Sequence, residues 1–110
     1  MVGRMKRGEI WLIDLGLAAK ARPAVILNIP FRDNEKAVVT YVARSLQRRG
    51  GRFEVDHQAP HFQPGVFDAQ NIGTVPVAKL IRRLADLPAD KFAEVKEAVS
   101  HWLGFAKSEP

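Results

Sequence analysis

Short apolar runs, separated by stretches that contain Gly, Pro, Asp or Asn, cover most of the chain as far as Leu84. Runs of this kind, rich in Val, Ile and aromatic residues, are typical of short strands bounded by turns. Pro23 cannot donate a backbone hydrogen bond, so it belongs at the start of its strand or at a sheet edge. The runs predict strands over Glu9–Asp14, Arg22–Asn28, Ala37–Ala43, Phe53–Asp56, Val66–Gln70, Ile72–Val77 and Leu80–Leu84.

The pattern changes to a helical period in the last part of the chain, over Pro88–Gly104. Proline is favoured in the first turn of a helix and glycine just beyond its end, so these two residues mark the boundaries. Strands followed by one helix indicate a mostly β fold, a small antiparallel barrel or half-barrel with the helix across its open side. One apolar stripe runs along the predicted helix: Phe92, Val95, Val99 and Trp102.

Two stretches show neither the apolar runs typical of strands nor the helical period. Arg44–Arg52 (RSLQRRGGR) holds four arginines and a Gly-Gly pair, which predicts a flexible basic loop. His57–Gly65 (HQAPHFQPG) holds two prolines and is predicted to be irregular.

The length of 110 residues fits one domain, expected over residues 1–110. The chain has no Cys, which excludes a disulfide framework and a cysteine metal site. Its apolar runs are too short for a membrane span. No apolar segment follows the basic N-terminal residues, so we expect no signal peptide and a cytoplasmic location.

The formal net charge is +5 and the sequence pI is about 10.0. A basic surface favours an acidic partner, such as RNA, DNA or an acidic protein segment. An excess of arginine also simply solvates a surface, and charge alone does not decide between these interpretations.

Four stretches in this order and spacing resemble the MazF/PemK family of toxins. The resemblance covers about residues 6–104, nearly the whole chain, although no single motif in it is specific. The stretches are KRGEIWLIDL, RPAVIL, VARSLQRRGGRFEV and GVFDAQNIGTVPVAKLIRRLADLPADKFAEVKEAVSHWLG.

The resemblance implies an SH3-like β-barrel with a C-terminal helix, the PemK/CcdB-like toxin fold, and a two-fold homodimer. It implies an endoribonuclease that cleaves single-stranded RNA at selected sequences without a metal or other cofactor. It also implies a cognate antitoxin protein that binds and inhibits the toxin.

RNA cleavage without a metal uses the 2′-hydroxyl as nucleophile, so the protein must accept its proton and stabilise the phosphorane. Arg22, immediately before Pro23, matches the family's catalytic arginine, and a guanidinium binds phosphate oxygens bidentately. Ser45 stands where the family usually has a catalytic threonine, and its hydroxyl can donate to phosphate. Without the resemblance, Arg22 is interpreted as a surface ion-pairing residue and Ser45 as a turn cap.

The sequence departs from the family at the general base. Gln70 stands where some relatives have a general-base Asp, Asp68 stands where some have Arg, and no Glu precedes Arg22 as it does in others. The base is therefore open among Asp68, His57 and His61, since histidine titrates near neutral pH. For the two histidines we favour the alternative that both are exposed loop residues.

Further residues are predicted to contact RNA or the antitoxin through phosphate groups, acidic side chains or bases. For Phe53 in the same region, a core position is favoured over base stacking. The predicted RNA-binding residues are Arg44, Arg48, Arg49, Arg52 and Gln70.

Two other functions remain open. The first is a protein-targeting toxin on the same barrel, like the gyrase poisons of the CcdB family; Arg22–Pro23 and the Ser45 hydroxyl argue against it. The second is a barrel that binds nucleic acid without cutting it, which Gln70 makes credible.

Overall fold

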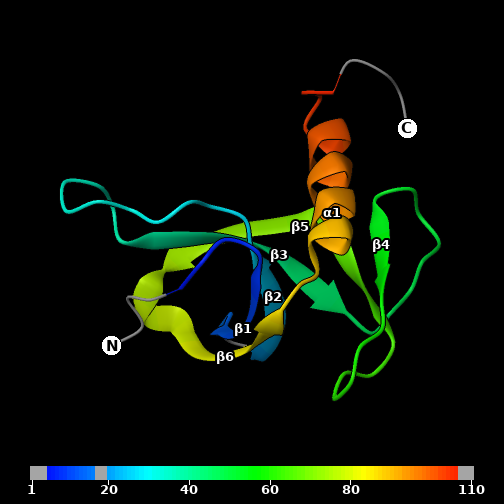
Figure 1. The fold of residues 1–110 in the computed structure, drawn as a ribbon, viewed down its shortest axis with the longest axis horizontal. Helices are drawn as coiled ribbons and strands as arrows, with labels where there is room; N and C mark the ends of the chain where they lie inside the picture. The colour runs from blue at the N-terminus through cyan, green and yellow to red at the C-terminus, as the bar shows by residue number, and fades with distance from the viewer. Residues whose placement is uncertain (1–4, 17–19, 107–110) are drawn as a thin grey trace.

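A computed structural model describes residues 5–16 and 20–106, and these form strands followed by one C-terminal helix (Figure 1). None of the helical segments in these two ranges is long and apolar enough to cross a membrane. The elements are β1 (Glu9–Asp14), β2 (Ala21–Ile26), β3 (Val38–Ser45), β4 (Glu54–His57), β5 (Gly65–Pro76), the 3-10 turn η2 (Val77–Lys79), β6 (Leu80–Asp86) and α1 (Ala89–Trp102).

The strands form one antiparallel sheet in the order β4-β5-β3-β2-β1-β6. The edge strands are β4 and β6, and the described residues show no pairing between them. The predicted mostly β fold with a C-terminal helix is therefore confirmed, whereas closure into an SH3-like barrel is not. In Figure 1 the sheet curves beneath α1, which stands over β5 beside β4.

Alternation of side chains along the strands gives the sheet two apolar faces. Ile10 of β1 lies opposite Val25 of β2, and both pack in the cluster that includes Val95 of α1. Trp11 and Ala24, one position further along their strands, belong to a second cluster on the other face. The helix covers only the first face, so the core depends on strand register as much as on helix packing.

The helix lies within the predicted range and is slightly shorter at both ends. It begins after Pro88 and ends at Trp102, and Gly104 follows with φ +79, the left-handed conformation that glycine adopts without strain. Phe92 and Val95 of the apolar stripe are buried, whereas Trp102 is partly exposed and contacts the ring of Phe53.

Several strand boundaries differ from prediction. The two runs predicted as separate strands, Val66–Gln70 and Ile72–Val77, form the single strand β5, and the predicted bend is a register shift within it. The strand predicted over Ala37–Ala43 continues through Arg44 to Ser45, so the basic loop begins later than expected.

A matched pair of isoleucines tests the division between core and surface. Ile10 is fully buried beneath α1, whereas Ile29 is 73% exposed. Ile10→Ala should lower the free energy of unfolding by roughly 2–5 kcal/mol, because it removes apolar contacts and leaves a cavity. Ile29→Ala should change it by less than about 0.5 kcal/mol. Urea titrations of the two variants measure both values, and equal losses would contradict the assigned packing.

Candidate functional site

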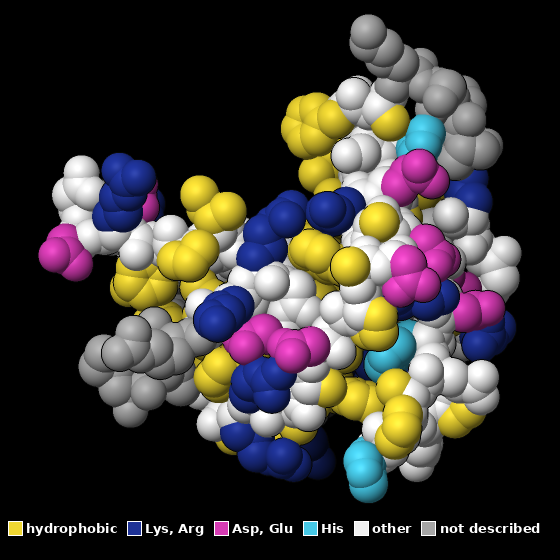
Figure 2. Space-filling model, viewed as in Figure 1, with side chains coloured by type: hydrophobic (Ala, Val, Ile, Leu, Met, Phe, Trp, Pro, Cys, Tyr) yellow, Lys and Arg dark blue, Asp and Glu magenta, His cyan; other side chains and the backbone are white. Residues whose placement is uncertain are grey.

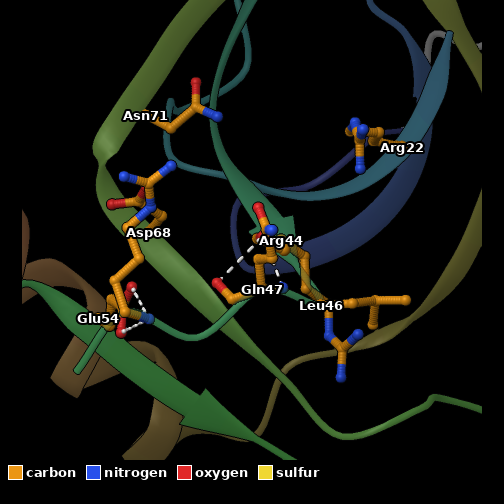
Figure 3. Close-up of a pocket in the computed structure, with 9 residues that line it drawn as sticks. Arg22, Arg44, Leu46, Gln47, Glu54, Asp68 and Asn71 are labelled. Atoms are coloured by element: carbon orange, nitrogen blue, oxygen red, sulfur yellow. Dashed lines mark hydrogen bonds between the residues drawn. The ribbon is translucent and has the colours of Figure 1, made fainter. Parts of the chain in front are cut away.

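A pocket of about 460 Å³ opens where β2, β3 and β5 lie side by side (Figure 3). In Figure 3, Asp68 and Asn71 lie on the β5 side of the pocket and Arg22 lies across from them on β2. The lining residues carry both signs of charge, with three arginines and two carboxylates. They are Arg22, Arg44, Ser45, Leu46, Gln47, Arg49, Glu54, Asp68 and Asn71.

Strand register explains why Arg22 and Ser45 share this pocket. β2 and β3 are antiparallel, with Ala24 opposite Ala43 and Val25 opposite Val42. The same register, continued by two positions, brings Arg22 level with Ser45. The two predicted catalytic residues, far apart in sequence, therefore line one pocket from neighbouring strands.

The Ser45 hydroxyl has a local partner as well. Its Oγ accepts a hydrogen bond from the backbone N–H of Gln47 at 3.0 Å. The turn-capping role considered for Ser45 is thus present in the structure. It leaves the hydroxyl proton available to a phosphate oxygen, because the contact from Oγ to the Gln47 carbonyl is long, at 3.4 Å.

A large bulge in β5 supplies the opposite wall. In the β3–β5 ladder, Val42 pairs with Ile72 and Arg44 pairs with Phe67. One residue of β3, Ala43, therefore lies opposite four residues of β5, Asp68–Asn71. The extra residues bend the strand, and Asp68 Oδ1 accepts from the Gln70 backbone N–H at 3.0 Å. This arrangement places Asp68 and Asn71 in the pocket lining, whereas Gln70 is exposed and outside that lining.

The loop between β3 and β4 is held by a carboxylate. Glu54 accepts hydrogen bonds from the backbone N–H groups of Arg49, at 3.0 Å, and Gly50, at 2.9 Å. Gly50 has φ +76, a conformation that a side chain would strain. These contacts give the predicted flexible loop a defined path beside the pocket, with Arg49 among the lining residues.

The predicted RNA-binding arginines separate into different environments. Arg49 lines the pocket. Arg48 forms an ion pair with Asp56, and Arg52 lies over the ring of Phe53, 4.6 Å from its centroid. Phe53 is 7% exposed, so its predicted core position is confirmed.

Arg44 requires a correction, because it is not part of an exposed loop. It lies in β3 and is 4% exposed. Its Nε donates to Nδ1 of His57 at 2.8 Å, and its Nη2 donates to the backbone carbonyls of His57 and Gln63. Burial lowers the pKa of this guanidinium. The recorded hydrogen bonds of its Nε and Nη2 are directed into the protein, while the residue also contributes to the lining of the pocket.

The interpretation of both histidines as exposed was wrong for His57. His57 is 4% exposed, and burial, followed by the charges of Arg44 and Lys91, lowers its pKa to about 4. His61 is exposed, as predicted. Neither histidine lines the pocket of Arg22 and Ser45, so Asp68 is the one proposed base found there.

Asn71, Gln47 and Glu54 were not singled out from the sequence as site residues. Alternation in β4 offered a signal for Glu54, because Val55 is apolar and points to the core, which directs Glu54 the other way. Asn71 offered none, since its position depends on the β5 bulge. Within residues 5–16 and 20–106, no three His, Asp or Glu side chains gather as a metal site.

Charge is unevenly distributed around the fold. On the face in Figure 2, acidic side chains gather over α1 and β4, whereas Lys and Arg predominate over the sheet below the helix, with a few acidic side chains between them. A polyanion therefore meets less repulsion at the sheet than at the helix.

Comparisons with known proteins agree with this architecture. The sequence profile described as "PemK-like, MazF-like toxin of type II toxin-antitoxin system" matches residues 6–103. The Mycobacterium tuberculosis toxin MazF-mt6 is 28% identical, with a TM-score of 0.75 over 89% of this chain and 98% of that one. No curated protein matches the sequence significantly.

Two further solved structures share the fold at lower identity. A mycobacterial endoribonuclease in complex with its cognate antitoxin is 24% identical, with a TM-score of 0.80 over 94% of this chain and 99% of that one. MazF in a MazE–MazF crystal structure from Deinococcus radiodurans is 22% identical, with a TM-score of 0.76 over 93% of this chain and 98% of that one.

The lowered pKa of His57 predicts a pH dependence of stability. The unfolded chain binds a proton at this histidine near pH 6.5 and the folded chain near pH 4, so the free energy of unfolding should fall as pH drops through that window. His57→Asn should remove roughly 2–3 kcal/mol of this dependence. Urea titrations between pH 7 and pH 4 give the differences, and identical slopes for parent and His57→Asn would refute the assignment.

Proposed function

We infer the function from the family to which this chain belongs, the PemK-like, MazF-like toxins of type II toxin–antitoxin systems. We propose that it is an endoribonuclease that cleaves single-stranded RNA at selected sequences without a metal. The supporting observation is the single pocket that holds the Arg22 guanidinium, the Ser45 hydroxyl and the Asp68 carboxylate.

The proposed reaction is an internal phosphoryl transfer. The 2′-oxygen forms a bond to phosphorus and the bond from phosphorus to the 5′-oxygen breaks, which leaves a 2′,3′-cyclic phosphate and a 5′-hydroxyl. The proton of the 2′-hydroxyl goes to a carboxylate, and the leaving oxygen takes a proton from water. Arg22 and Ser45 donate hydrogen bonds to the phosphoryl oxygens, whose charge rises in the transition state.

Asp68 is the proposed general base. It lines the pocket opposite Arg22, and with Oδ1 bound to the Gln70 amide it keeps Oδ2 for the transferred proton. Glu54 is less suited, because backbone N–H groups occupy both of its oxygens. His57 and His61 each line a different pocket, away from Arg22 and Ser45.

Substrate binding is proposed to extend from the pocket along the β3–β4 loop. Arg49 lies at the pocket, and Arg48 and Arg52 lie elsewhere in the same loop. Arg48 is paired with Asp56 and Arg52 lies over the ring of Phe53, so each would bind a phosphate in addition to that partner. Gln70 is exposed within the β5 bulge and is proposed to contact a base. Arg44 is left out of this set because it is buried.

The proposed partners are a second copy of the chain and a cognate antitoxin in the cytoplasm. The mycobacterial neighbour is an endoribonuclease bound to its cognate antitoxin. An antitoxin segment with acidic residues is expected to cover the Arg22 face, since it meets arginines there as RNA does. The other candidates, a gyrase poison and a barrel that binds without cutting, need no Arg22-dependent cleavage.

Replacing Arg22 tests the catalytic proposal directly. Arg22→Ala should slow cleavage of a fluorogenic RNA–DNA chimera in EDTA by about a hundredfold or more, roughly 3 kcal/mol of transition-state stabilisation. Arg22→Lys should recover little, because an ammonium lacks the bidentate fork. Arg32→Ala, an exposed arginine outside the pocket lining, serves as the control and should be unchanged. Full activity of Arg22→Ala would leave only the binding function.

Replacing Asp68 tests the base. Asp68→Asn keeps an oxygen that can accept from the backbone N–H of Gln70, but it cannot take the proton of the 2′-hydroxyl. Turnover should therefore fall by about 10²–10⁴-fold, the usual contribution of a general base. Asp33→Asn, at an exposed aspartate in the turn before β3 and outside the pocket, is the matched control. If Asp68→Asn cleaves the same chimera at the parental rate, another group takes the proton.

A further inference from the structure

We propose that Arg44, His57, Gln63 and Gly65 form a positioning unit for Ser45, here called the Arg44 clamp. It acts through Ser45 and not on RNA itself, so this inference rests on the proposed nuclease function. No member of the clamp was assigned this role from the sequence.

The clamp ties three segments of chain together at the rear of the pocket. Arg44 reaches from β3 to the imidazole and carbonyl of His57, the last residue of β4, and to the carbonyl of Gln63 in the loop before β5. Ser45 is the next residue after Arg44. A change that moves the β3 backbone at Arg44 therefore moves Ser45 as well.

Gly65 holds Ser45 from a second direction. Gly65 pairs with His57 in the β4–β5 ladder, and the following residue, Val66, pairs with Ser45. A Cβ added at Gly65 would lie 2.6 Å from the Ser45 carbonyl oxygen and 3.0 Å from Nη1 of Arg44. Only glycine permits this close approach, so β5 supports the backbone of Ser45 directly.

The clamp depends on a neutral acceptor at His57. The Nδ1 atom can accept from Arg44 only when it carries no proton, and the ring is packed against Phe62 and Phe67, with centroids 5.2 and 5.1 Å away. The charged groups facing this histidine are Arg44 from β3, Lys91 from α1, and Arg48 and Asp56 beside the shared surface pocket. Burial and the two cations both keep the imidazole neutral, as the lowered pKa near 4 reflects.

Arg44 also brings an uncompensated charge to the pocket wall. Across the described ranges, no carboxylate forms a salt bridge with Arg44, whose recorded acceptors are an imidazole and two carbonyls. Its positive charge is thus satisfied by hydrogen bonds but not neutralised. No carboxylate among the described residues therefore replaces the His57 acceptor if Arg44 loses it.

Two replacements of His57 separate positioning from chemistry. His57→Asn places an amide oxygen near the position of Nδ1 and keeps an acceptor for the Nε of Arg44, whereas His57→Leu removes that acceptor and leaves only the two backbone carbonyls bound to Nη2. His57→Leu should lower kcat by on the order of tenfold, since a displacement of about 1 Å in a site is enough for such a loss. His57→Asn should recover most of it, and His61→Asn is the exposed control.

A double-mutant cycle tests whether the effect passes through Ser45. In a Ser45→Ala background, His57→Leu should cost less than about twofold, because the hydroxyl that it positions is gone. Equal losses in both backgrounds indicate a general loss of folded protein and would overturn the proposal. An unchanged kcat in His57→Leu would overturn it as well.

A measurement on the unmodified protein keeps the inference testable if His57→Leu fails to fold. Nitrogen NMR of the imidazole at pH 7 should show the tautomer protonated at Nε2, with Nδ1 as acceptor, and an Nδ1–H tautomer would exclude the clamp. The backbone amide resonance of Ser45 should shift in His57→Leu and return to its parental position in His57→Asn, both in the presence and in the absence of RNA.

These resonances also separate the two proposals. If the parent protein does not cut RNA but the Ser45 resonance shifts as expected, the nuclease proposal is refuted and the positioning of Ser45 by the Arg44 clamp is retained.

Discussion

The burial of the Arg44 guanidinium constrains the whole functional end of the molecule. A charged group is stable away from water only where acceptors meet it in good geometry. Those acceptors come from the end of β4 and from the loop before β5, so both segments must lie against the end of β3. The register of the β3–β5 ladder at Ser45, and with it the shape of the pocket, follows from that requirement.

The pocket itself is built largely from strands rather than from free loops. Arg22 and Ser45 project from neighbouring strands, and Asp68 projects from a bulge that the β3–β5 pairing fixes on both sides. Side chains held this way lose little entropy when a substrate binds, and their spacing is set by the backbone. Only the Arg49 side of the pocket depends on a connecting loop, and there Glu54 holds two backbone amides.

The sequence was informative wherever a property belongs to a local pattern. Short apolar runs bounded by turn residues located β1 and β2, and the spacing of Phe92 and Val95 located α1, because both patterns are local consequences of strand and helix geometry. The pairing of Arg22 with Ser45 in one site came from the family resemblance, since no local rule gives the register of two strands. Closure of the sheet was overestimated for the same reason: strand count does not fix whether the edges meet.

The errors over Arg44 and His57 share one cause. Each residue, taken singly, is typical of a protein surface, and both lie in segments without apolar periodicity. They are buried because they satisfy each other, and a mutual hydrogen bond between residues on two strands is invisible to a pattern read along one. Their burial therefore had to be seen in three dimensions.

The departure from the family at Gln70 can be understood through the β5 bulge. In a regular strand, residues 68 and 70 would face the same side, and a carboxylate at either position would serve one pocket equally well. In this chain the bulge separates them, with Asp68 in the pocket lining and Gln70 outside it. On the proposed mechanism, the proton acceptor is Asp68, two residues before Gln70 in sequence. The β5 bulge places its carboxylate opposite Arg22, where the mechanism needs one.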